Sequence, residues 1–299
     1  FRSCPYNNLC FVLRKETYNA ITLNRLLGIR LDDDKNETSM SIFNINAYDI
    51  IIFDEIFLYS LNNLDRMRQF MGKFEDKRFY ATGDEYQLPP IEEHVNVPNR
   101  KEFYKAAVAS LFPNQITLKE NKRCKSQKGR NQMKEISDRI KNAKSKAEAL
   151  SIIYKYFKIV NKLEDVCSEN NVVYTNQCGD YINKSIHSKK SSGRKYFEGL
   201  KLIGSHTAET EKGHKIYVNY TYYIDKIRGD TAHINNLEEV FTVKLSELDL
   251  HFKLPYARTC HSMQGLSVEG EITIFEVDHP YVSIAWLYIA ITRDRKSVV

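Results

Sequence analysis

The sequence predicts an α/β fold, because a short apolar run and an aromatic, β-prone run are each followed by acidic residues and a stretch with helical spacing lies between them. The first run, YDIIIF at 48–53, ends at Asp54-Glu55, and the second, at 78–82, is followed by Gly83-Asp84. Short apolar runs of this kind are typical of buried parallel strands, and residues 61–72 have apolar side chains at helical spacing. Open α/β sheets bind ligands at the carboxyl ends of their strands. The acidic residues are therefore expected where a ligand would bind.

The middle of the chain continues the alternation of helices and strands. Residues 131–158 are rich in Lys, Glu, Ala and Leu and are expected to be helical. Residues 171–174 are expected to form a strand and 180–186 a helix, and the polar, basic run HSKKSSGRK at 187–195 is expected to be a loop or a boundary.

In the last third of the chain the pattern of residues changes. Residues 196–250 contain short β-prone pieces separated by turn residues, which predicts a small antiparallel β unit. After this unit, 271–277 (EITIFEV) is expected to be a strand and 284–291 a buried helix.

Composition narrows the class of protein. The net charge of +6 over 299 residues favours a polyanionic partner only weakly. The six cysteines are scattered without a CxxC pair, which argues against a zinc site and predicts reduced thiols in an intracellular protein. No apolar run approaches the roughly 20 residues that a membrane span needs, so no membrane partner is expected.

Asp54 and Glu55 are candidate residues of a nucleotide site. One carboxylate after a buried strand can hold Mg²⁺, usually through water, and the next can polarise the attacking water. Taken alone, such a pair is more often an acidic helix N-cap.

The stretch RFYATGDEYQLPP at 78–90 favours the nucleotide site. A turn would explain Gly83 and the two prolines, Pro89 and Pro90, but it would not explain Gln87. An uncharged amide can donate a hydrogen bond to a γ-phosphate oxygen without the desolvation cost of a buried cation. The two prolines fix the backbone that follows, so that a shift at the phosphate would move it as a rigid piece.

These motifs resemble those of a known family. IIIFDE at 50–55 followed by GDEYQLPP at 83–90 resembles motifs II and III of the superfamily 1 DNA helicases, especially the RecD-like branch. Further segments resemble motif IV, the next TN-containing motif, motif V and motif VI, in the family's order: LKENKR at 118–123, NVVYTNQCGDYIN at 171–183, TCHSMQG at 259–265 and YIAITR at 288–293. TYNAITLNRLLGI at 17–29 resembles the segment after motif Ia, although Asn24 stands where histidine is common.

The resemblance implies two RecA-like P-loop NTPase domains, at 1–115 and 116–299. The first would lack its P-loop strand, and the second would carry a small SH3-like β insert at about 196–250, where this branch has such a barrel. ATP would bind between the domains, with Mg²⁺ held through Asp54. The implied function is that of an ATP-dependent DNA helicase, which translocates on single-stranded DNA and unwinds duplex DNA with 5′→3′ polarity.

The resemblance also assigns roles to individual residues. The catalytic residues would be Asp54, Glu55, Gln87, Arg123 and the arginine finger Arg293. The nucleotide would also contact Gly83, Asp84 and Gly265. Nucleic acid would contact Thr22, Pro89, Thr175, Asn176, Thr259, His261, Ser262 and Gln264.

Several of these residues have simpler explanations when each is taken alone. Arg123 could belong to a solvated basic run, and Arg293 could be a charge favoured at a helix C-terminus. His261 has no second ligand at metal spacing. The alternating aromatics of 217–223 could stack on bases, although packing inside a barrel is the more common role.

The phosphate cradle G-x-x-x-x-G-K-[ST] is not found in these 299 residues. Because the other phosphate-coupled residues are in place, we expect the chain to be a fragment rather than a relative that has lost ATPase activity. We also expect 294–299, DRKSVV, to be non-native, because these residues match the translation of a common sequencing adapter. In this fold the strand of the cradle lies beside the strand at 78–82, so its absence would leave an apolar strand edge unpaired.

Two alternative functions remain open at this stage. The chain could be a nucleic-acid-binding or regulatory module without ATPase chemistry, or a superfamily 1 RNA helicase of viral replication. DNA is the expected partner ahead of RNA, and replication or recombination proteins are candidate further partners.

We predict that residues 1–299 alone express poorly and show no ATP hydrolysis stimulated by nucleic acid, because the cradle is missing and a strand edge is unpaired. A phosphate-release assay with and without single-stranded DNA measures this. ATP turnover by this chain would contradict the prediction and would require a different phosphate cradle.

Overall fold

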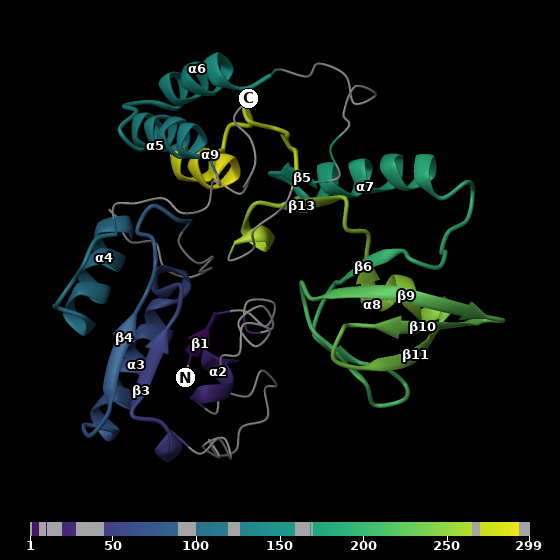
Figure 1. Cartoon of the computed structure of the whole chain (residues 1–299), viewed down its shortest axis with the longest axis horizontal. Coiled ribbons are helices and arrows are strands. Elements are labelled where there is room, and N and C mark those ends of the chain that lie inside the picture. The colour runs from purple at the N-terminus through teal and green to yellow at the C-terminus, as the bar shows by residue number, and fades with distance from the viewer. Residues whose placement is uncertain are drawn as a thin grey trace. The chain divides into compact units, whose positions relative to one another are not determined.

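The computed structural model describes residues 2–5, 10, 20–27, 45–88, 100–118, 126–158, 168, 170–264 and 270–292. The chain divides into two compact units, Phe1–Glu120 and Asn121–Val299. Each unit contains a parallel sheet with helices, which confirms the α/β class (Figure 1). No helix in the described ranges is long and apolar enough to cross a membrane.

The first unit is built on a parallel sheet. Its described strands run in the order β2 (Ala20–Thr22), β1 (Arg2–Cys4), β3 (Ile50–Phe53) and β4 (Arg78–Ala81). Helix α3 (Leu61–Lys73) connects β3 to β4, and helix α4 (Arg100–Leu111) follows later in the chain. The predicted strand, helix and strand are therefore present, with bounds within one or two residues of the expected ones.

The core of this unit explains why these residues form these elements. Ile51 and Phe53 of β3 are fully buried, and α3 buries Leu64, Met67 and Phe70, the positions of its helical apolar pattern. Ser60 begins the helix, because its hydroxyl accepts a hydrogen bond from the Asn63 amide at 3.1 Å.

Burial of the two strands is less complete than expected. Ile50 is 41% exposed, and Tyr80 of β4 is 52% exposed. The expectation of a fully buried strand at 48–53 was therefore wrong at Ile50, the first residue of β3. The exposure of Tyr80 follows from the position of β4, which is an edge strand of the described sheet with β3 as its one neighbour there.

The second unit has a parallel sheet in the order β13 (Ala257–Thr259), β5 (Asn170–Val173), β14 (Ile272–Ile274). Helix α7 (Asn176–Lys190) lies beside this sheet (Figure 1). Its Ile182 is buried in a cluster with Val173 and Ala257. Helix α9 (Ile284–Ile291) is buried over most of its length and has the predicted bounds.

Two helical regions have bounds that differ from the expected ones. The region expected to be helical at 131–158 contains two helices, α5 (Gln127–Lys141) and α6 (Lys146–Tyr156). The break occurs because Ser145 caps the second helix, accepting from the Glu148 amide at 3.2 Å. Helix α7 is longer than the expected 180–186 and takes in residues 187–190 of the supposed loop, where its basic last turn is favoured by the helix dipole.

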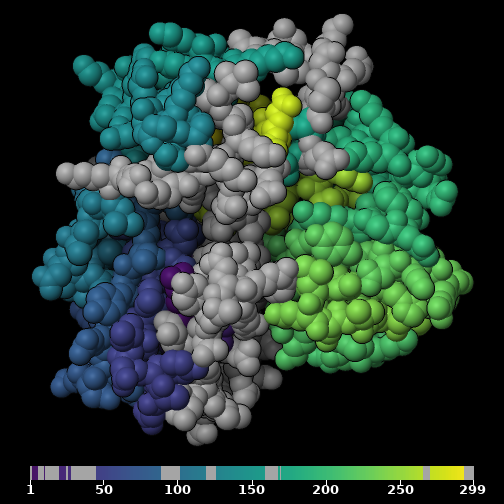
Figure 2. Space-filling model, in the orientation of Figure 1, coloured from purple at the N-terminus to yellow at the C-terminus, as the bar shows by residue number. Residues whose placement is uncertain are grey.

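The predicted β insert is an antiparallel sheet within the second unit, which confirms that expectation. Its strands run in the order β11 (Val240–Lys244), β10 (Thr231–Asn235), β9 (Thr221–Arg228), β6 (Lys201–Gly204), β12 (Phe252–Lys253). Strands β7 (Ala208–Glu209) and β8 (Lys215–Ile216) form a separate hairpin, and the short helix α8 (Leu248–His251) precedes β12. In Figure 2 the insert appears in light green as a closely packed block.

Two of the aromatic residues at 217–223, Tyr220 and Tyr222, are packing residues. Tyr222 is fully buried and Tyr220 is 4% exposed. The Tyr222 hydroxyl accepts a hydrogen bond from the Tyr217 amide at 2.9 Å. Their burial favours the packing role over base stacking for these two residues.

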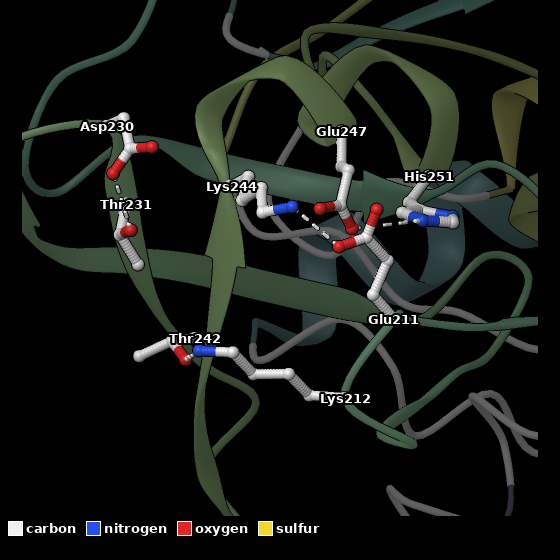
Figure 3. A network of polar contacts seen from close by, with 8 residues as sticks. All are labelled: Glu211, Lys212, Asp230, Thr231, Thr242, Lys244, Glu247 and His251. Atoms are coloured by element: carbon white, nitrogen blue, oxygen red, sulfur yellow. Dashed lines mark hydrogen bonds and ion pairs between the residues drawn. The ribbon is translucent and has the colours of Figure 1, made fainter.

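Charged side chains tie the β7–β8 segment to the edge strand β11 (Figure 3). Lys244 Nζ lies 2.7 Å from Glu211 Oε2, and Lys212 Nζ donates to Thr242 Oγ1 at 2.8 Å. Beside them, Nε2 of His251 on α8 lies 3.9 Å from Oε2 of Glu247, the residue just before that helix. Exposed ion pairs contribute little to stability, so the pair of Lys244 and Glu211 fixes local arrangement more than it stabilises the fold.

The segments that follow β3 and β4 approach each other so closely that residue 83 has little room for a side chain. The Ile56 amide donates to Thr82 O at 2.8 Å, and the Thr82 amide donates to Phe53 O at 2.9 Å. A Cβ on Gly83 would lie 2.9 Å from Ile56 Cγ2 and 3.1 Å from Ile56 N. A side chain there would push the two strand ends apart.

We predict that Gly83→Ala destabilises the full-length gene product by about 1–3 kcal/mol, because the added methyl overpacks the β3–β4 junction. Gly72→Ala is the matched control, since Gly72 lies in α3 and an added Cβ meets nothing within 4 Å. The control should be stabilising by about 0.5–1 kcal/mol, the helical advantage of alanine. Urea-unfolding midpoints measure both, and equal shifts would contradict the prediction.

Candidate nucleotide site and nucleic-acid interface

The carboxyl ends of β3 and β4 bring together several of the predicted nucleotide residues. Asp54 follows β3 directly, and its Oδ1 accepts hydrogen bonds from the Thr82 hydroxyl and, at 3.1 Å, from the Glu55 amide. Its own amide donates to Ser3 O of β1 at 2.7 Å. Backbone and side chain of Asp54 are thus held by the two strands on either side of β3.

Glu55 contacts a different partner from that of Asp54. Its Oε2 accepts a hydrogen bond from Gln87 Nε2 at 3.0 Å, across 32 positions of sequence. Glu55 has a left-handed backbone, with φ 54° and ψ 50°. Such a conformation costs a residue with a side chain on the order of 1–3 kcal/mol and is often found at functional sites. The two adjacent acids therefore serve different neighbours, Thr82 and Gln87.

A tight turn positions Gln87. Asp84 Oδ1 accepts from the Tyr86 amide at 2.9 Å, and Asp84 O accepts from the Gln87 amide at 3.0 Å. Gln87 is 8% exposed, and its Oε1 is buried with no hydrogen-bond partner among the described residues. The site thus contains an acceptor that an incoming donor would satisfy.

The neighbourhood of Asp54 fits a magnesium ion held through water. Asp54 Oδ2 lies 4.0 Å from Arg2 Nη1, and the side chain is 18% exposed. In the described part of the chain no three His, Cys, Asp or Glu side chains form a metal-binding group. Mg²⁺ prefers oxygen ligands and commonly keeps several waters, so one accessible carboxylate suits it.

Sequence reasoning missed Thr82 and Arg2 as neighbours of Asp54. Thr82 belongs to the quoted stretch at 78–90, and a hydroxyl at the end of a strand could have drawn attention to it. Arg2 carries no local signal, because its place beside Asp54 depends on the pairing of β1 with β3.

In the second unit, Thr175 and Asn176 lie at the start of α7. Thr175 is the N-cap, and its Oγ1 accepts from the Cys178 amide at 3.2 Å. Asn176 is exposed. A residue not predicted from the sequence, Glu276, contacts this helix start from the end of β14, where its Oε1 accepts from the Thr175 hydroxyl at 2.7 Å.

The predicted motif V residues form a compact turn after β13. The Ser262 hydroxyl donates to Thr259 O at 2.9 Å, and Arg258 Nη2 donates to Ser262 O at 2.9 Å. Burial lowers the pKa of His261 below its usual value, so its ring is neutral at pH 7. Gln264 is 2% exposed. Of the predicted contacts in this turn, Gln264 is thus the least accessible.

Burial also lowers the pKa of Arg258, to about 10. Arg258 was not singled out from the sequence. Its hydrogen bond to Ser262 O connects strand β13 to the turn that follows it.

The remaining predicted residues are placed separately or not at all. Thr22 ends β2, at the same edge of the first sheet as Asp54 but two strands away. Pro89, Arg123, Gly265 and Arg293 lie outside the described residues. The structure therefore brings Asp54, Glu55 and Gln87 together.

Comparisons with known proteins give structural matches alone. No protein-family model matches the chain, and no match is found among curated proteins. Among solved structures, one of Pif1 helicases in a study of DNA unwinding at forked duplex DNA has a TM-score of 0.62 at 14% identity, over 100% of this chain and 82% of that one.

Two further structures are similar. Bacteroides Pif1 bound to single-stranded DNA has a TM-score of 0.61 at 14% identity and covers 100% of this chain and 83% of its own. Bacteroides sp. Pif1 in complex with ADP-AlF4 has a TM-score of 0.52 at 15% identity, over 99% and 80%. At such low identity the likeness concerns architecture, and the chain has the fold of Pif1 helicase structures along its whole length.

Proposed function

We propose that this chain is the motor part of an ATP-dependent DNA helicase that translocates on single-stranded DNA and unwinds duplex DNA. The observation that carries the proposal is the cluster of Asp54, Glu55 and Gln87 at the carboxyl ends of β3 and β4. The fold of Pif1 helicases supports it, and so does the binding of single-stranded DNA and of ADP-AlF4 by structurally similar proteins. We further propose two RecA-like domains, at 1–115 and 116–299, and 5′→3′ polarity.

In this proposal Asp54 holds Mg²⁺ through water. The bound ion would neutralise charge that develops on the phosphates. Thr82 and the Glu55 amide keep Asp54 Oδ1 in place, so Oδ2, which lies 4.0 Å from Arg2 Nη1, is the oxygen that the water shell would contact.

Glu55 and Gln87 would orient the attacking water. Gln87 Nε2 is engaged with Glu55 Oε2, so its buried Oε1 is the group left to accept a hydrogen bond. A water between them could donate one proton to the Glu55 carboxylate and the other to Gln87 Oε1. The second N–H of the Gln87 amide would still be able to donate to the γ-phosphate, the role expected from the sequence.

The second unit would hold the nucleic acid. Hydroxyl groups, amides and a neutral imidazole suit the sugar-phosphate backbone, because they hold register without recognising bases. We assign this role to Asn176, Thr259, His261 and Ser262, and we propose that Arg123 and Arg293 meet the charge of the phosphates during hydrolysis.

We predict that Glu55→Gln lowers ATP turnover by the full-length gene product by about 10²-fold or more, the contribution typical of a general base. Gln87→Ala should also lower turnover, while both variants keep their affinity for single-stranded DNA. Phosphate release under saturating DNA measures the loss. Glu85→Gln is the control, because Glu85 pairs with Lys105 at 2.8 Å rather than with the cluster, and its turnover should stay within about twofold.

Unwinding assays test the remaining parts of the proposal. We expect the full-length gene product to open duplexes with a 5′ single-stranded DNA tail and to leave those with a 3′ tail closed. Stronger stimulation by single-stranded RNA than by DNA would favour an RNA helicase. If the wild-type protein binds DNA but hydrolyses ATP no faster than Glu55→Gln does, the remaining function is that of a binding module without ATPase chemistry.

A further inference from the structure

The carboxylate of Glu276 joins the end of strand β14 to the start of helix α7. Its Oε2 accepts hydrogen bonds from the Tyr174 amide at 2.9 Å and the Thr175 amide at 2.8 Å. Its Oε1 accepts from the Thr175 hydroxyl at 2.7 Å. The three donors all belong to the segment that leads into the helix, about 100 residues earlier in the chain. Glu276 thus connects two parts of the second unit that the sequence keeps far apart.

The turn that carries Glu276 is itself held in place. Glu276 has a left-handed backbone, with φ 58°, and its carbonyl oxygen accepts from the His279 amide at 3.0 Å. The His279 ring lies 4.5 Å from the Tyr174 ring, between centroids. Lys146 of α6 donates to His279 O at 2.5 Å. These contacts therefore fix the turn that holds the Glu276 carboxylate against the start of α7.

The contact determines what Thr175 can do. The Thr175 hydroxyl has one proton, which it donates to Glu276, and its oxygen accepts from the Cys178 amide. In this arrangement Thr175 has no proton to donate to a phosphate. Asn176, the exposed first residue of the helix, is the neighbouring group that is free to reach a ligand.

We propose that Glu276 is a positioning residue for nucleic-acid binding, which fixes Tyr174 and Thr175 so that Asn176 is presented to the sugar-phosphate backbone. This inference rests on the proposed function. Two effects of Glu276 oppose each other, because its negative charge repels phosphate while its hydrogen bonds order the helix start. Ordering prevails, since charge-assisted bonds to a partly buried carboxylate are strong and repulsion near the surface is screened by salt.

The sign of the affinity change separates positioning from repulsion. In the full-length gene product, Glu276→Ala should weaken binding of a fluorescent oligothymidylate by about tenfold, although the protein becomes more positive. Asp278→Asn is the matched control, since Asp278 is an exposed acid two residues further on. It removes the same charge without touching α7, and its binding should be unchanged or slightly tighter. Fluorescence anisotropy at fixed salt measures both.

A double-mutant cycle shows whether Glu276 acts through Asn176. Asn176→Ala should weaken binding by itself, and adding Glu276→Ala to it should then cost little more. A general structural defect would instead lower the affinity by the same factor in both backgrounds.

The reactivity of the Cys178 thiol measures the effect of the Glu276 carboxylate in the absence of DNA. Burial, and next the negative charge of Glu276, raise the pKa of Cys178 to about 11. Glu276→Gln removes that charge and keeps the shape, so the pKa of Cys178 should fall and its alkylation at pH 8.5 should become faster. Mass spectrometry of the Cys178 peptide measures the rate.

The outcomes are distinct. Unchanged or tighter DNA binding by Glu276→Ala, with wild-type protein that binds DNA, would overturn this inference and leave the proposed function intact. Wild-type protein that binds no single-stranded nucleic acid would overturn the proposed function, and this inference with it.

Discussion

The candidate nucleotide site depends on the pairing of β3 with β4. Their parallel register sets Phe53 opposite Ala81, so that the chain leaves both strands at the same level. Asp54 then meets the hydroxyl of Thr82, and Glu55 meets the amide of Gln87. A shift of the register by one residue would turn each side chain to the other face of the sheet and would separate both pairs. Hydrogen bonds from Thr82 and Gln87 thus position the two acids, and the pairing of β3 with β4 positions the segments that carry these residues.

The buried oxygen of Gln87 makes this site incomplete by itself. A buried acceptor without a partner costs about 1–3 kcal/mol, and Gln87 Oε1 has none among the described residues. The same amide group already supplies its nitrogen to Glu55. A donor that entered the site would recover this cost, so the geometry favours binding of a water or ligand hydrogen at that point. This is a stronger argument for a functional site than the acidic pair alone, which an N-cap would also explain.

The sequence predicted the elements whose pattern is local. Helix α9 and the strand, helix and strand of the first unit follow from runs and periods of apolar residues, and the cluster of Asp54, Glu55 and Gln87 follows from the motifs around them. Strands β1 and β2 have three residues each, too few for a periodic signal. The split between α5 and α6 depends on one cap, Ser145. The contact between Glu276 and Thr175 spans 101 positions, and tertiary structure alone creates it.

The two units share an arrangement that neither motif spacing nor burial would suggest. In each, a glutamate follows a parallel strand in a left-handed conformation: Glu55 after β3, with φ 54°, and Glu276 after β14, with φ 58°. Each carboxylate accepts hydrogen bonds from another segment of its unit, Gln87 in one and Thr175 in the other. Glycine would adopt this backbone without strain. A glutamate at such a position is explained by its side chain, because the left-handed residue ends the strand while its carboxylate holds a neighbouring polar group at the edge where α/β sheets bind their ligands.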